Sequence, residues 1–368
     1  MAKAKSIEIL NRYGQSAWYD NLSRDVLQKG ELQRLINLGI SGLTSNPSIF
    51  KSAIADSTDY DADIRLLAGR GLSEEQICEE LMLEDVRHAA DLLRPVYEES
   101  EGTDGYASVE VSPLLAYDVQ QTLEQARRIW GAISRPNLMI KVPATQEGLV
   151  AIRTLLEEGI NVNVTLIFSV EVYRTVMDAY LSALESRRQR GESVAGIASV
   201  ASFFVSRVDE ICERELSKLK NISMEPFFGE VAVANSKMAY ALYQDYFTSE
   251  RFFSLKKYGA KVQRPLWAST GTKNPKLPPL VYVNALAGRD TVNTLKPETL
   301  AVLLETEDLS PALHEGLDRA RDLLAALGRM GVDLNTCMKE LEEAGVKAFA
   351  DAYRVLLESI RRKVRALT

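Results

Sequence analysis

The chain has 368 residues, of which 46% are hydrophobic and 26% are charged, a balance that excludes a disordered or collagen-like chain. Its 51 acidic and 44 basic residues give a net charge of −7, which argues against a nucleic-acid or anionic-membrane partner but not against a small phosphate in a local basic pocket. Three scattered cysteines, no membrane-length apolar run and no signal-peptide pattern predict a cytoplasmic protein. The two histidines, His88 and His314, argue against a Ser-His-Asp site or a multi-His metal site.

Eight short apolar or β-branched runs follow one another along the chain, and each predicts a strand. They lie at 16–22, 42–46, 106–112, 138–144, 161–168, 197–204, 265–270 and 280–285. Helical patterns separate them, at 25–38, 73–97, 118–130, 146–158, 170–190 and 208–219. Repeated strand–helix alternation predicts an α/β fold, a single (β/α)8 barrel. An open doubly wound sheet is the alternative, disfavoured because no glycine-rich dinucleotide turn follows any strand.

The chain is longer than the ~250 residues of a plain barrel, so we expect one domain over 1–368 with added segments. Helical insertions are predicted near 47–105 and 230–257, and a helical extension at 288–368. The last helix, 345–367, is amphipathic, with one apolar face. We expect this face to pack across the outside of the barrel or to cover its mouth.

Five of the predicted strands carry a polar group where a barrel strand should be apolar. These groups are Asp20, Asn46, Glu110, Lys141 and Asn163. A buried charge is costly unless it is paired, and most of these residues lie near the carboxyl ends of their strands, where barrel active sites are built. The pattern therefore predicts an active site at that end.

Lys141 is a lone lysine in the apolar run LMIKVPA. A desolvated lysine holds its proton less tightly, and its neutral amine can attack a carbonyl to form a Schiff base. The alternative is a structural ion pair with Glu110 on the neighbouring strand. Glu110 with the hydroxyl of Thr165 could also move protons through a water, as Schiff-base chemistry requires. Asp20 could remove a hydroxyl proton during carbon–carbon cleavage, or it could cap a turn.

The two asparagines have different alternatives. Asn46 precedes Pro47, and a simple Asn-Pro turn with Asn46 as a cap explains it without function. Asn163 lies inside the run NVNVT, where asparagine is unfavourable in a strand, so a functional role is favoured there.

Several motifs resemble those of the transaldolase family, in chain order. They are TSNPSIF (44–50), VEVSP (109–113), MIKVPAT (139–145), GINVNVTLIFS (159–169), ASFFVSRVDE (201–210) and WASTGTKNP (267–275). The similarity runs from about Asp20 to at least Asn284, and the helix KAFADAYRVLLESI (347–360) also resembles the family's last helix. The length and WASTGTKNP are similar to the longer bacterial members.

The resemblance implies a class I aldolase-type barrel with Lys141 as the Schiff-base nucleophile on the fourth strand. It implies Asp20 as the general acid and base for carbon–carbon chemistry, and Glu110 with Thr165 as the holders of the catalytic water. By the same resemblance, the residues that bind the sugar and its phosphate are Asn46, Asn163, Ser202, Phe204, Arg207 and Ser269.

One position departs from the family pattern. Many transaldolases place an arginine two residues after the serine that matches Ser269, but Gly271 stands there in this chain. We predict that Lys273 replaces this phosphate-binding cation; the alternative is a solvated loop charge.

The resemblance implies transfer of a dihydroxyacetone unit from sedoheptulose 7-phosphate to glyceraldehyde 3-phosphate, giving erythrose 4-phosphate and fructose 6-phosphate in the non-oxidative pentose phosphate pathway. No metal or organic cofactor is expected, nor any nucleic-acid or membrane partner, and the enzyme would be a monomer or homodimer. The alternatives are a fructose 6-phosphate aldolase-type lyase and a catalytically silent sugar-phosphate-binding barrel.

Overall fold

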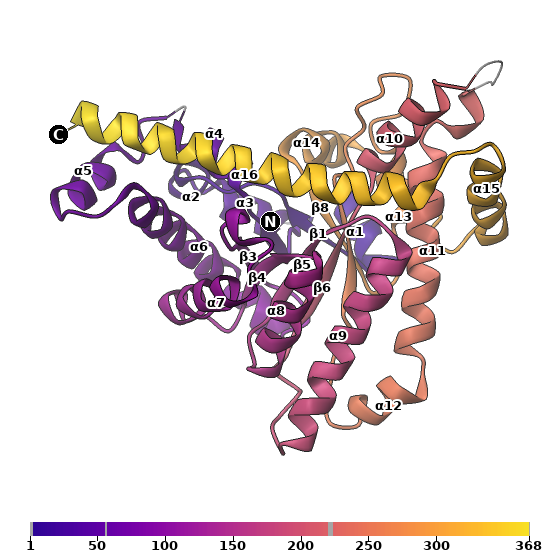
Figure 1. Cartoon of the computed structure of the whole chain (residues 1–368), viewed down its shortest axis with the longest axis horizontal. Coiled ribbons are helices and arrows are strands. Elements are labelled where there is room, and N and C mark those ends of the chain that lie inside the picture. The colour runs from indigo at the N-terminus through magenta and orange to yellow at the C-terminus, as the bar shows by residue number, and fades with distance from the viewer. Residues whose placement is uncertain (1–2, 56, 220–223, 368) are drawn as a thin grey trace.

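The computed structural model describes residues 3–55, 57–219 and 224–367. In these residues, eight parallel strands close into a barrel in which each strand pairs with the next and β8 returns to β1 (Figure 1). The expected (β/α)8 barrel is thus confirmed. The strands are β1 (Gln15–Tyr19), β2 (Gly42–Thr44), β3 (Ala107–Glu110), β4 (Leu138–Pro143), β5 (Val162–Ile167), β6 (Ser199–Phe204), β7 (Arg264–Ala268) and β8 (Thr291–Leu295).

The prediction of the eighth strand at 280–285 is wrong. That run forms a short helix, α13 (Val281–Leu286), and β8 has the sequence TVNTL. Periodicity alone cannot separate a short apolar strand from a short buried helix, and β8 itself contains three polar residues out of five. The extension predicted at 288–368 therefore contains the last strand, and its helical part begins with α14 (Pro297–Glu305).

The helices that connect the strands match most of the predicted ranges. α6 (Glu74–Glu99) begins with the expected capping box of Ser73 and Gln76. The helix predicted at 25–38 is divided at Gly30, whose φ of +73° ends one helix before the next begins. The other connecting helices are α2 (Arg24–Gln28), α3 (Glu31–Leu38), α7 (Val119–Ile133), α8 (Gln146–Glu157), α9 (Val170–Gln189) and α10 (Ser206–Leu216), and α1 (Lys5–Arg12) precedes the first strand.

The predicted insertions are helical. The first contains α4 (Pro47–Ala55) and α5 (Asp61–Gly69) ahead of α6. The second contains α11 (Glu230–Phe247) and α12 (Glu250–Lys256), where the hydroxyl of Ser249 accepts from the Phe252 N–H and starts α12. The short helices η1 (Pro113–Leu115) and η2 (Glu225–Phe227) lie in connections, and α15 (Leu317–Arg329) packs beside α11.

The last helix, α16 (Leu334–Leu367), begins earlier than predicted and has 34 residues. It runs across the molecule in Figure 1, from the α15 side to α5, and it contacts α4, α5, α6, α10 and β5. Its buried face includes Gly345, Phe349, Tyr353 and Leu356. Both expected positions are observed, because the helix packs on helices outside the barrel and its Phe349 lines a cavity at the barrel mouth.

No helix in the described ranges combines the length and the apolar character that crossing a membrane requires.

Candidate functional site

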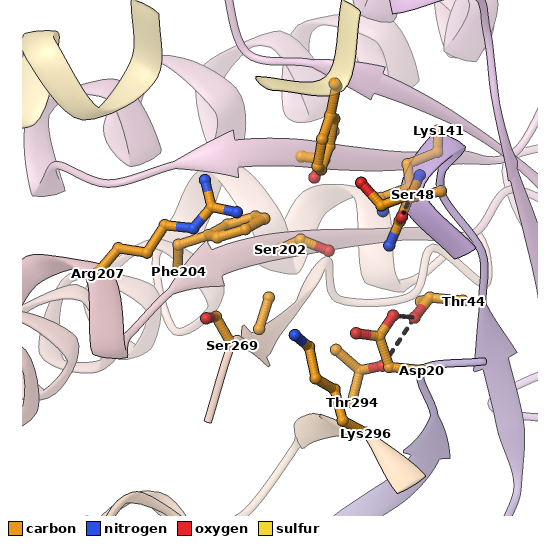
Figure 2. A pocket seen from close by; sticks show the side chains of 14 residues that line it. Asp20, Thr44, Ser48, Lys141, Ser202, Phe204, Arg207, Ser269, Thr294 and Lys296 are labelled. Atoms are coloured by element: carbon orange, nitrogen blue, oxygen red, sulfur yellow. Dashed lines mark hydrogen bonds between the residues drawn. The ribbon is translucent and has the colours of Figure 1, made fainter. Parts of the chain in front are cut away.

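A cavity of about 110 Å³ lies at the carboxyl ends of the strands, the end at which barrel enzymes place their chemistry (Figure 2). Most of the residues predicted from the sequence line it. They are Asp20, Asn46, Lys141, Thr165, Ser202, Phe204, Arg207 and Ser269. Glu110 on β3 and Asn163 on β5 are the register partners of Lys141 and do not line the cavity themselves, and Lys273 lies outside it.

Lys141 and Glu110 are register partners on adjacent strands, and their side chains are 6% and 2% exposed. Lys141 Nζ lies 3.6 Å from Glu110 Oε2 and donates to the Ser45 carbonyl at 3.3 Å. The structural ion pair considered from the sequence is therefore present. Because Lys141 also lines the cavity, the pair leaves its amine accessible to a substrate carbonyl.

Burial raises the pKa of Glu110 to about 7; Lys141 opposes the rise, and the charge of Asp20 adds to it. Glu110 Oε2 and Thr165 Oγ1 are both buried and have no hydrogen-bond partner among the described residues. Seven other buried polar atoms in the described residues also have no partner, so the significance of these two lies in their position beside the Lys141 amine and on the cavity wall, where a water or a ligand can complete them. A carboxyl group that titrates near neutrality can give and take a proton, as general acid–base catalysis requires.

The backbone of β5 is distorted where it presents Thr165. The pairing of β5 with β6 shifts register between Val164 and Ile167, and Leu166 adopts a φ of +57°. A bulge redirects side chains, and a non-glycine residue in the left-handed region stores strain that is concentrated at functional sites. The distortion follows directly after Thr165, whose side chain lines the cavity.

Asp20 follows β1 and is half-buried at the edge of the cavity. Its Oδ1 accepts from Thr44 Oγ1 at 2.8 Å, and the Thr44 hydroxyl lies 2.7 Å from the hydroxyl of Thr294 (Figure 2). This chain of groups connects the first, second and eighth strands and fixes the carboxylate. Asp20 does not cap the following helix, because Ser23 does so.

The two asparagines are used differently. Asn46 Oδ1 accepts from the N–H groups of Ser48 and Ile49 at 3.0 and 3.1 Å, so the capping alternative is present, and only the amide NH2 is left for a substrate. Asn163 is fully buried; it donates to Ser108 Oγ at 3.1 Å and accepts from Ser202 Oγ at 2.7 Å. Asn163 thus orients Ser202, which does line the cavity.

The end of the cavity near β6 and β7 is suited to an anion. Arg207 forms no ion pair among the described residues; burial lowers its pKa, while Glu210 opposes this change. Its guanidinium carbon lies 5.3 Å from the centre of the Phe204 ring. A half-buried guanidinium without a carboxylate partner is a ready site for a phosphate.

Lys273 does not reach this cavity. Its Nζ lies 2.7 Å from Glu210 Oε1 in a separate surface depression with Asn274 and Tyr282. Lys296 lines the cavity instead, at the carboxyl end of β8 (Figure 2), and forms no ion pair within the described part of the chain. Sequence reasoning missed Lys296 because the eighth strand was misplaced; the signal was a lysine directly after TVNTL.

Among the described residues, no three His, Cys, Asp or Glu side chains gather as a metal site would need. The expectation of no metal or organic cofactor remains a prediction.

Comparison with known proteins agrees with this geometry. Residues 17–360 match the family model described as Transaldolase/Fructose-6-phosphate aldolase. The chain is 44% identical to "Transaldolase 2" of Nostoc sp. strain PCC 7120, with 98% of this chain and 97% of the relative covered. It is 44% identical to a transaldolase of Thermobifida fusca (98% and 99% covered) and 45% identical to one of Thiobacillus denitrificans (95% and 98%). The chain therefore belongs to the transaldolase/fructose-6-phosphate aldolase family and is an enzyme of the transaldolase type.

Proposed function

We propose that this enzyme moves a dihydroxyacetone unit between sugar phosphates through a Schiff base on Lys141. The observation that carries the proposal is the buried Lys141 amine in the cavity wall, 3.6 Å from a carboxyl group with a pKa of about 7. The donor is sedoheptulose 7-phosphate and the acceptor is glyceraldehyde 3-phosphate; erythrose 4-phosphate and fructose 6-phosphate are the products.

Imine formation needs a neutral amine and a path for protons. The Lys141 amine attacks the ketone carbon, and the carbinolamine then loses water when its hydroxyl receives a proton. Glu110 and Thr165 support this role because each has a buried oxygen without a hydrogen bond among the described residues, which a bound water could supply.

Cleavage then needs a base at the hydroxyl beside the bond that breaks. Asp20 is fixed by Thr44 and faces the same cavity as Lys141. Its carboxylate takes the hydroxyl proton, the aldehyde leaves, and the electron pair passes into the protonated imine to give an enamine. The enamine carbon attacks the acceptor aldehyde, and the same steps run in reverse.

For the phosphate we propose Arg207 and Lys296, with the hydroxyl of Ser269 beside them. All three line the same cavity, and the two cations have no carboxylate partner among the described residues. A sugar phosphate carries nearly two negative charges, so two unpaired cations match it. Lys273 is the competing prediction, although Glu210 already neutralises its charge.

The family model covers aldolases that release dihydroxyacetone as well as transaldolases. Transfer is favoured because the relatives that align over nearly the whole chain are transaldolases, and because a helix lies over the mouth. A silent binding barrel would not be expected to keep Lys141, Asp20 and Glu110 together. We further propose a single-domain cytoplasmic enzyme of the non-oxidative pentose phosphate pathway, as a monomer or homodimer.

Borohydride reduction in the presence of fructose 6-phosphate tests the proposal. The expected result is a dihydroxyacetone-derived mass on the peptide that contains Lys141, found by peptide mass mapping, and loss of both label and turnover in Lys141→Ala. Label on Lys296 or Lys273 would contradict the assignment.

A further inference from the structure

The last helix contacts the active site at two points on one face. Gly345 and Phe349 are four residues apart on α16, so they lie one above the other. A Cβ added at Gly345 would lie 2.9 Å from Leu166 Cδ2 and 3.7 Å from the guanidinium of Arg207. The helix therefore sits directly against the strained residue that follows Thr165, and glycine is what permits this approach.

One turn further along, Phe349 enters the cavity wall. Its side chain is almost fully buried, and its ring centre lies 5.8 Å from Lys141 Nζ. The residues around the reactive amine are otherwise mostly polar, since Asp20, Asn46 and Thr165 line the same cavity. Phe349 is thus an apolar group brought to a polar site by a helix that lies outside the barrel.

We infer that Phe349, held in place by the docking of α16, determines how much of the three-carbon intermediate on Lys141 is lost to water rather than passed to an acceptor aldehyde. The inference rests on the proposed Schiff-base mechanism. It assigns Phe349 a role in reaction specificity, and it makes Gly345 and Leu166 the positioning contacts.

The loss reaction has defined steps. The enamine carbon takes a proton from the Asp20 carboxyl, which gives the iminium ion of dihydroxyacetone. Water adds to the iminium carbon and gives one proton to Glu110. The carbon–nitrogen bond then breaks, dihydroxyacetone leaves as the free ketone, and the Lys141 amine is restored. Transfer avoids these steps because the enamine carbon attacks an aldehyde instead.

Phe349 acts on this competition by occupying space near the nitrogen that water would otherwise fill. A buried water needs two or more hydrogen-bond partners, and the phenylalanine ring has no polar atom to offer. The polar groups of this cavity would attract water if the ring were removed. A smaller residue at position 349 therefore lets water reach the iminium carbon of the intermediate.

The test compares Phe349→Ala and Phe349→Leu with Val355→Ala, whose residue is 47% exposed on the same helix. Each variant is given fructose 6-phosphate with and without an acceptor aldehyde. Free dihydroxyacetone and the transfer product are measured separately. We expect the ratio of release to transfer to rise several-fold in Phe349→Ala and less in Phe349→Leu, which keeps apolar bulk. Val355→Ala should match the unmodified enzyme.

Borohydride trapping at Lys141 separates the two possible failures. If the unmodified enzyme is not labelled there, the Schiff-base proposal fails and the inference fails with it. If all forms are labelled and the release ratio is the same in the Phe349 variants as in the unmodified enzyme, the inference alone is overturned. Should Phe349→Ala not fold, Phe349→Leu still decides the question, since an unchanged ratio in a folded Leu variant contradicts the inference.

Discussion

Lys141 and Glu110 are register partners on β4 and β3, and the charge of Lys141 affects the pKa of Glu110. The lysine lowers the pKa of the carboxyl group, but burial outweighs it and leaves that pKa near 7. An ion pair buried on both sides contributes little net stability, because desolvation offsets the attraction. Its presence at the wall of a cavity is explained better by proton transfer than by stability.

We predict that Glu110→Gln removes a pH dependence centred near pH 7 from kcat/KM for the donor ketose. Below that pH the carboxyl group is protonated and cannot act as a base; above it the group is ionised and cannot donate a proton. Glutamine does neither, so the variant should be slow and should lack this transition. Steady-state rates from pH 5.5 to 8.5 measure it; a transition retained at the same pH in the variant would assign it to another group.

Lys296 and Lys273 give opposing predictions for the phosphate. Lys296→Ala should raise KM for fructose 6-phosphate by roughly a factor of ten, because an exposed hydrogen bond to a charged group contributes ~1.5 kcal/mol, the low end of its range. Lys273→Ala should leave KM nearly unchanged, because Glu210 pairs that ammonium. An unphosphorylated ketose donor provides the control, since neither variant should affect it. The reverse order of effects would restore the original expectation for Lys273.

At the scale of elements, Lys296 can be recognised as a cavity residue only when β8 is placed correctly, because the lysine directly follows that strand. The apolar run at 280–285 has more strand character than TVNTL, whose Asn293 and Thr294 are both buried and polar. Their side-chain hydrogen bonds reach other parts of the barrel: Asn293 Oδ1 accepts from Thr270 Oγ1, and the Thr294 hydroxyl lies 2.7 Å from the Thr44 hydroxyl. One partner is in β2 and the other follows β7, so the local sequence of β8 could not reveal them. Lys141 and Glu110 could be identified from the sequence because a charged residue within an apolar run is visible in the local sequence.

Asp209 on α10 fixes the start of α11 and one side of α13. Its Oδ1 accepts from the Ala232 N–H at 2.8 Å, and its Oδ2 accepts from the Tyr282 hydroxyl at 2.6 Å. Burial raises the pKa of Asp209 to about 7, although both hydrogen bonds oppose the rise. The unfolded chain therefore binds fewer protons than the folded one between about pH 4 and pH 7.

The stability of the protein should accordingly fall as pH rises through that window, by up to a few kcal/mol from this group. In Asp209→Asn the contribution is absent. The difference in free energy of unfolding, variant minus unmodified, should therefore increase from pH 4.5 to 7 and then level off. Urea unfolding at several pH values measures it; a difference that is independent of pH would show that Asp209 is already ionised throughout.

At the scale of the whole molecule, α16 connects parts of the chain that the barrel alone keeps apart. Near one end it contacts α10, where Arg214 pairs with Glu340, and near the other it contacts α5, where Lys363 pairs with Asp61. The amphipathic face of this helix was evident in the sequence. Which surface it would cover was not, because an apolar face specifies burial and not a partner.

The order of synthesis gives this arrangement a further consequence. α16 follows all eight strands in the chain, so it leaves the ribosome after them. The barrel can close and bring Lys141, Glu110 and Asp20 together while the surface that α16 will cover still faces solvent. Apolar surface exposed in this way is what chaperones and aggregation act upon during synthesis. The mouth of the barrel is therefore covered only after the barrel itself has been synthesised.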